Sequence, residues 1–368
     1  MRLKKSFTPY IKLREFVVER QIKKVIFALF LGGVSGYLFY LASLPLPWML
    51  GAMFINIIAA LLRLPVAGPT KLRPTVAVVI GVMLGSSFTP TIFDQIIYWV
   101  PSLIFMALYL FVTGLVIIPY YRKVAGFDLS TAYFAGMPGG LMEMMIIGKE
   151  MGADERSIIL AHTSRIVLVV ALVAVWFRVV QGIDLMERPQ FGTPLSHIPA
   201  IELITLSVVG VLGYFLGRFV HLPAPMLLGP IIVSAAVHVL GFVENPPPSE
   251  LVVIAQIFLG TIFGCRFTNA EPKAILRAIW LGLGATLLML TLTFGFAIAL
   301  HEIFEQSVEE LVLAYSPGGL AEMSLVALAM NADVAYVSTH HVVRVSLIML
   351  VAPLLFRFLL RSKEKSSY

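Results

Sequence analysis

Residues 138–165 read PGGLMEMMIIGKEMGADERSIILAHTSR, and residues 317–344 read PGGLAEMSLVALAMNADVAYVSTHHVVR. The two stretches align without a gap at a shift of 179 residues, and 11 of their 28 positions are identical. The identities include polar residues that are rare in this chain, so a shared apolar composition does not explain them. The chain is therefore built from two related halves.

Shorter motifs extend the duplication toward the start of each half. The turn LPLP at 44–47 recurs as LPAP at 222–225, and a Gly-x-x-x-Gly pair at 81–85 recurs at 260–264. Glycines four residues apart lie on one face of a helix, where a second helix can approach closely. We therefore expect these glycines to serve helix packing, and the prolines of the turn to start a helix.

The composition is that of a membrane protein. Of the 368 residues, 59% are apolar and 13% are charged, whereas about a quarter of an average soluble domain is charged. Apolar segments long enough to cross a bilayer take up most of the chain, which leaves no room for a soluble catalytic, nucleotide-binding or DNA-binding domain. The single cysteine, Cys265, excludes an intrachain disulfide and a cysteine-based metal cluster.

Charge and hydropathy divide the chain into five parts. The first 24 residues carry eight basic side chains, and the apolar run that follows is too long for a cleavable signal peptide, so we expect it to be retained as the first span. We expect a basic cytoplasmic tail at 1–24, a first membrane repeat at 25–181, a linker at 182–198, a second membrane repeat at 199–360 and a basic tail at 361–368.

The distribution of Lys and Arg decides between two topologies of the twelve apolar segments, six in each half. If all twelve cross the membrane, the halves are parallel, with 19 basic residues inside and 6 outside. If the Pro-Gly-Gly segment of each half is broken or re-entrant, the halves are inverted, with 23 inside and 2 outside. Because basic residues gather on the cytoplasmic side, the second topology is favoured. The sequence predicts an all-α polytopic membrane protein with two inverted repeats, each of five spans plus one broken segment, and both termini cytoplasmic.

Each broken segment centres on a Pro-Gly-Gly triplet. Proline removes a helix hydrogen bond and glycine bends easily, so we do not expect a continuous helix through either triplet. Interrupted helices line the substrate site in secondary transporters, whereas elsewhere such kinks serve packing alone. Both interpretations stay open, and the matched positions in the two halves favour a site. The triplets are Pro138, Gly139 and Gly140 in the first half and Pro317, Gly318 and Gly319 in the second.

An acidic residue follows each triplet on the first turn of the next helix. A carboxylate at Glu143 or Glu322 can cap that helix, or it can bind a proton or a cation within the membrane. Asp154 and Asp333 lie further on, just before the next apolar run, and we expect them to be helix caps.

A His-x-x-Arg motif completes each half of the pattern. His162 and Arg165 share a helix face, as do His341 and Arg344. An arginine this deep in an apolar segment needs a partner. Either a buried glutamate forms a structural pair with it, or a substrate anion binds it while the histidine titrates nearby.

These duplicated motifs resemble the AbrB-type membrane protein family, and the resemblance covers nearly the whole chain. It implies a duplicated membrane domain in the bacterial inner (plasma) membrane. Members of the family have been labelled ammonia monooxygenases and have been linked to control of gene expression. The chain has no cluster of His or carboxylates with the spacing of a copper or iron site, which argues against the monooxygenase label.

The inverted repeat and the polar motifs predict a secondary transporter of a small anionic solute, coupled to an ion or proton and working by alternating access. A membrane sensor that affects gene expression through a partner is the alternative. We expect no enzyme activity, no cofactor, no metal site and no direct nucleic-acid binding. The expected partners are the lipid bilayer and a small molecule or ion, and a homodimer stays open.

The topology yields a direct test. A reporter cysteine in the 182–198 connection, in a Cys265→Ala background, should react with an impermeant thiol reagent added to intact cells, because inverted repeats place this connection outside. Protection of that cysteine, while a control cysteine elsewhere reacts, would instead indicate twelve spans and parallel halves.

Overall fold

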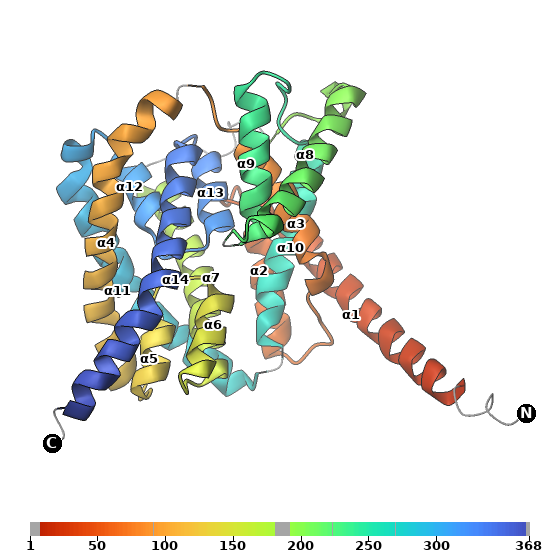
Figure 1. The fold of residues 1–368 in the computed structure, drawn as a ribbon. Helices are drawn as coiled ribbons and strands as arrows, with labels where there is room; N and C mark the ends of the chain where they lie inside the picture. Colours follow the sequence, from red (N-terminus) through yellow and green to blue (C-terminus); the bar gives the residue numbers. More distant parts are fainter. Residues whose placement is uncertain (1–7, 91, 181–191, 223, 269, 366–368) are drawn as a thin grey trace, which may run out of the picture.

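The computed structural model describes residues 8–90, 92–180, 192–222, 224–268 and 270–365 (Figure 1). Within these ranges turns and loops join the helices and the chain forms no strand, which confirms the all-α prediction. The first half contains α1 (Thr8–Leu41), α2 (Pro47–Leu61), α3 (Arg73–Gly85), α4 (Ile92–Lys123), α5 (Leu129–Gly136), α6 (Leu141–Glu150) and α7 (Glu155–Val180). The second half contains α8 (Ala200–Phe219), α9 (Pro225–Val239), α10 (Ser249–Gly264), α11 (Pro272–Phe304), α12 (Val308–Tyr315), α13 (Leu320–Ala329) and α14 (Val334–Lys365).

The helices of the two halves correspond one to one in order, and most pairs are similar in length, although α1 has 34 residues and α8 has 20. The short pairs α5–α6 and α12–α13 are the two broken segments, and in Figure 1 α5 and α6 lie in the lower part of the view while α12 and α13 lie in the upper part. Three short 3₁₀ helices, η1 (Thr70–Leu72), η2 (Leu195–His197) and η3 (Cys265–Phe267), complete the fold. Residues 182–191 of the expected linker lie outside the described residues.

The two expected tails adjoin long helices. Helix α1 begins at Thr8, so it contains part of the expected tail at 1–24, and α14 continues to Lys365 into the expected tail at 361–368. An α-helix rises about 1.5 Å per residue, so both helices are longer than the roughly 30 Å that a hydrocarbon core requires.

Within the described residues, seven helices are long and apolar enough to cross a membrane. Helices α2 and α9 are apolar but have only 15 residues each. Large apolar side chains on the outer helices, such as Ile97, Phe215 and Leu350, are exposed, as expected of surfaces that face lipid. The chain is therefore a multi-pass helical membrane protein. The seven segments are Glu19–Leu41, Gln95–Lys123, Glu155–Val179, Ala200–Phe219, Ser249–Phe267, Pro272–Phe304 and Val334–Leu359.

The proline turns have the same backbone conformation in both halves. Leu46 and Ala224 adopt left-handed conformations, with φ of 44° and 48°, at the N-caps of α2 and α9. Pro47 and Pro225 then occupy the first helical positions, where the missing N–H costs nothing. The turn motif starts a helix in each half, as predicted.

Helices α1, α2, α3, α8, α9 and α10 pack into one layer, which we term the scaffold group (right side of Figure 1). Within it the halves exchange partners: α3 of the first half packs on α9, and α10 of the second half packs on α2. The Gly-x-x-x-Gly motifs form both contacts. A Cβ at Gly81 would lie 2.7 Å from the carbonyl oxygen of Leu227, and a Cβ at Gly260 would overlap the carbonyl oxygen of Met49. The packing role predicted for these glycines is confirmed.

The remaining helices, α4–α7 and α11–α14, form the motif group (left side of Figure 1), which contains both broken segments. Helix α11 packs on α4 and α7, and α14 packs on α4. Contacts between the two groups are fewer and run mainly from α3 to α13 and α14 and from α2 to α11. The polar motifs therefore lie together in a bundle that touches the scaffold group over a small number of helices.

The glycine contacts predict a clear stability effect. Alanine at Gly81 or Gly260 should lower the free energy of unfolding by about 1–3 kcal/mol, because the methyl group would force the paired helices apart. A methyl group at Gly295 on α11 meets no atom within 4 Å, so Gly295→Ala should raise stability by about 0.5–1 kcal/mol. Thermal unfolding of the purified variants checks both, and equal melting temperatures for G260A and G295A would contradict the packing.

Candidate functional site

Each Pro-Gly-Gly triplet completely interrupts its helix. Helix α5 ends at Gly136 and α6 starts at Leu141, with extended backbone at Met137 and Gly140. In the second half α12 ends at Tyr315 and α13 starts at Leu320, again with extended backbone at the flanking residues. The predicted break is confirmed in both halves, and each one is an interruption rather than a kink.

Each proline leaves one carbonyl oxygen without its helical donor. In an α-helix the N–H of residue 138 would donate to the carbonyl of Phe134, but proline has no N–H. The ring of His162, from α7, lies 2.8 Å from that oxygen through Nε2. In the second half Pro317 removes the donor for Leu313, and His341 Nε2 lies 3.0 Å from the Leu313 oxygen. The histidine of each motif therefore replaces the hydrogen bond that the proline removes.

The arginines act on the same helix ends. Arg165 Nη1 donates to the carbonyl of Met137 at 3.3 Å, and Arg344 donates to the carbonyls of Ser316 and Gly318. A helix C-terminus presents unpaired carbonyls and partial negative charge, so a guanidinium there is favourably placed. Each His-x-x-Arg motif thus caps the C-terminal end of the short helix before the break.

The hydrogen bonds fix the tautomer of His162. Its Nδ1 lies 3.1 Å from Arg165 Nη2, and a guanidinium can only donate. Nδ1 is therefore the acceptor, and Nε2 carries the proton that is donated to Phe134. In the second half the Nδ1 atom of His341 is buried without a hydrogen-bond partner. The two histidines bond equivalent carbonyls, but the motifs differ at this atom and in the additional bond from Arg344 to Gly318.

The glutamate partner allowed by the sequence is not present. No carboxylate of the described residues lies within 4.0 Å of Arg165 or Arg344, although each arginine is only 2% exposed. The reason is geometric, because the arginines face the end of the helix before the break while the glutamates lie on the helix after it. The Nε atom of each arginine is also buried without a hydrogen-bond partner.

The two motifs meet around α4. Tyr109, buried on α4, is near enough to both arginines to interact with their charges, and the charges of Arg165 and Arg344 repel each other. The hydroxyl of Tyr109 is 2.9 Å from Thr293 Oγ1 on α11. Tyr109 could not be singled out from the sequence, because a single tyrosine in an apolar span carries no pattern; its proximity to both arginines depends on helix packing.

The side chains of Glu143 and Glu322 fold back toward the break. Their Oε2 atoms occupy the space that a Cβ would need at Gly140 and Gly319, the N-cap residues of α6 and α13. Glu322 is buried and also interacts electrostatically with Arg266 and Arg73 of the scaffold group. The glycines are therefore needed here for close approach of a carboxylate.

The aspartates cap helices as predicted. Asp154 accepts a hydrogen bond from the backbone N–H of Ser157 at 3.1 Å, at the start of α7. Asp333 accepts one from the backbone N–H of Tyr336 at 2.9 Å, at the start of α14. These caps position the helices that carry the His-x-x-Arg motifs.

Comparison with known proteins identifies a family model that covers both motifs. A family model described as "Transition state regulatory protein AbrB" matches residues 48–360, which include both broken segments and both His-x-x-Arg motifs. The chain belongs to the AbrB family. The family membership expected from the duplicated motifs is confirmed.

Two relatives are similar over nearly their whole length. "Uncharacterized protein YhjN" of Bacillus subtilis (strain 168) is 24% identical, with 93% of this chain and 94% of the relative covered. "Putative regulator AbrB" of Escherichia coli (strain K12) is 23% identical, with 89% and 94% covered. The similarity covers most of this chain and most of each relative, and neither printed name states a substrate.

The contact between Glu322 and Gly319 can be tested by a double-mutant cycle. Gly319→Ala should cost about 1 kcal/mol of stability, because the new methyl group displaces the Glu322 carboxylate from the first turn of α13. In a Glu322→Ala background the same change should cost much less, because the carboxylate is already absent. Thermal unfolding of the four proteins measures the coupling, and strictly additive effects would show that the carboxylate does not depend on the glycine.

Proposed function

We propose that the protein is a secondary transporter of a small anionic solute, which binds between Arg165 and Arg344. One observation carries the proposal: two buried guanidinium groups are near enough to repel each other, have no carboxylate partner among the described residues, and each retain an unused Nε donor. Buried positive charge without a counter-ion is unfavourable in a membrane. An oxyanion would supply the missing charge and accept the spare N–H groups, since guanidinium binds carboxylates and phosphates well.

Inverted topology fits the helix arrangement. Helix α3 of the first half packs on α9, and α10 of the second half packs on α2. In Figure 1 the pair α5–α6 lies in the lower part of the view and the pair α12–α13 in the upper part. A two-fold axis in the membrane plane would produce both relations. Together with the basic residues counted inside, these features support two inverted repeats of five spans plus one broken segment, in an inner membrane, with both termini cytoplasmic.

The hydrogen bonds suggest how anion binding couples to a proton. Arg165 donates to Nδ1 of His162, which prevents that nitrogen from accepting a proton. An anion that draws the Arg165 guanidinium toward itself releases Nδ1, and His162 can then be protonated. In this scheme a proton accompanies the anion. The conformational change is a movement of the motif group, with its two broken helices, relative to the scaffold group.

A regulatory role is the second candidate, favoured by the family description and by the printed name of the Escherichia coli relative. A regulator would bind its ligand at the same arginines and signal to a partner without transport. Deletion of residues 1–24 distinguishes the regulator from the transporter. A regulator should lose its effect on transcription, whereas a transporter that still inserts into the membrane should keep its transport activity.

Arginine substitutions test the anion site. Phosphate, sulfate and small mono- and dicarboxylates are screened for those that raise the melting temperature of the purified wild-type protein. Arg165→Gln or Arg344→Gln should weaken the binding of such an anion by about tenfold or more, since a charge-assisted hydrogen bond is worth about 1.5–3 kcal/mol. Uptake of that anion into proteoliposomes should fall in parallel.

Arg178→Gln is the matched control. Arg178 also lies on α7 and donates to backbone carbonyls, at Ala42 and Ser43, but it is near the end of the helix and away from the breaks. It should bind and transport like wild type. Unchanged uptake in a protein that carries both Arg165→Gln and Arg344→Gln would overturn the proposed site.

A further inference from the structure

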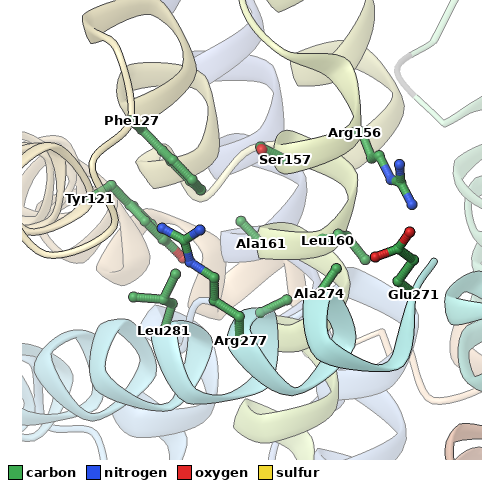
Figure 2. A pocket seen from close by; sticks show the side chains of 11 residues that line it. Tyr121, Phe127, Arg156, Ser157, Leu160, Ala161, Glu271, Ala274, Arg277 and Leu281 are labelled. Atoms are coloured by element: carbon green, nitrogen blue, oxygen red, sulfur yellow. The ribbon is translucent and has the colours of Figure 1, made fainter. Parts of the chain in front are cut away.

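A cavity of about 320 Å³ opens between α7 and α11, with Tyr121 and Phe127 at one side (Figure 2). Its inner wall lies near the proposed anion site. Ala161 is one helical turn before Arg165 and shares its face, and buried Tyr121 interacts electrostatically with Arg165. Among the residues that line the cavity, Ala161 is one helical turn from the first arginine, which does not itself line it. It is lined by Tyr121, Phe127, Arg156, Ser157, Leu160, Ala161, Glu271, Ala274, Arg277, Ala278 and Leu281.

The charges at its mouth favour anions. Figure 2 shows Arg156 and Glu271 pointing toward each other, whereas Arg277 lies apart from them beside Tyr121. Arg277 is exposed and donates to the carbonyl of Ala125 at 2.9 Å, which holds its guanidinium at the cavity. With Glu271 facing Arg156, the charge of Arg277 gives the mouth a net positive potential.

The equivalent place in the second half is filled. At the shift of 179 residues, Ser157 and Ala161 correspond to Tyr336 and His340. The tyrosine and histidine are both buried, whereas serine and alanine leave space beside α7. The second half thus has large side chains on α14 at the positions where the first half has small ones on α7.

On the facing helix one small residue corresponds to a large one, and one large residue corresponds to a small polar one. Ala278 and Leu281 on α11 correspond to Trp99 and Ser102 on α4, and both of these are buried. The Trp99 ring packs edge-on against Tyr336 with centroids 5.5 Å apart. Ser102 Oγ lies 2.7 Å from the Tyr336 hydroxyl and 2.9 Å from His340 Nε2. We call these four residues, Trp99, Ser102, Tyr336 and His340, the plug.

We propose that the cavity is the cytoplasmic vestibule through which a small oxyanion reaches Arg165, with Arg277 as its recruiting residue, and that the plug closes the equivalent path to Arg344 from the opposite side. The inference rests on the proposed transport function and adds the route and the side of entry. A volume of about 320 Å³ is at the lower end of ligand pockets, so it suits an inorganic oxyanion or a carboxylate of a few carbons.

Thiol labelling tests the vestibule without a known substrate. In a Cys265→Ala background, Ala161→Cys is treated with two methanethiosulfonate reagents, one with an anionic sulfonate and one with a cationic ammonium group. In inside-out vesicles the anionic reagent should react faster, and in right-side-out vesicles neither should react. Arg277→Gln should lower the ratio of anionic to cationic rates by about fivefold, because a nearby unit charge is lost. Arg218→Gln, on α8 in the scaffold group, should leave the ratio unchanged.

Exchange of the corresponding side chains tests the plug. Ala278→Trp with Ser157→Tyr should fill the vestibule and protect the cysteine at 161. Trp99→Ala with Tyr336→Ser should open the other path, so that a Ser102→Cys thiol becomes reactive in right-side-out vesicles. If the opened variant does not fold, the filled variant and the Arg277→Gln ratio still decide.

Two results would overturn the vestibule: a cysteine at 161 that does not react from the cytoplasmic side, or a charge preference that Arg277→Gln leaves unchanged. Neither measurement uses an anion substrate. Their failure would thus remove the vestibule alone, whereas wild-type binding by Arg165→Gln and Arg344→Gln would remove the proposed transport function.

Discussion

A proline within an apolar helix leaves the carbonyl oxygen four residues earlier without a donor, and the membrane offers no water to replace it. In this protein the oxygens of Phe134 and Leu313 are in that position, and His162 and His341 supply the missing donors. Each arginine then caps the same helix end. The break, the histidine and the arginine therefore form one unit, which explains why the chain carries all three at the same spacing in both halves.

This unit also concentrates positive charge in the interior. The glutamates cannot neutralise it, since they are bound at the opposite side of the break over Gly140 and Gly319. Within the part of the chain that the structure describes, carbonyl dipoles and polar groups such as His162 and Tyr109 face the charge of Arg165 and Arg344. The requirement for a structural cap and the capacity to bind an anion are thus properties of the same two side chains.

The sequence predicted the features that carry a residue signature: the duplication, the two breaks, the aspartate caps and the glycine contacts. It did not predict the partners of Arg165 and Arg344, because a backbone carbonyl carries no signature of its own. The division into two helix groups could not be predicted either, since α3 pairs with α9 across more than a hundred residues. Ser102 and His340 are distant in sequence, so their contact within the plug also depended on the structure.

The exchange of helices within the scaffold group constrains how the protein is made. Helix α2 can pack on α1 within the first half, but α3 packs mainly on α9 and α10, so it has no main partner until the second half has left the ribosome. The first half therefore cannot complete its packing as an independent unit, although it contains a full repeat. The glycine face of α3 stays unpaired in the bilayer while the linker and the five helices α4–α8 are synthesised, a long-range dependence that slows folding. A chain cut within the linker would need both pieces present in one membrane to assemble.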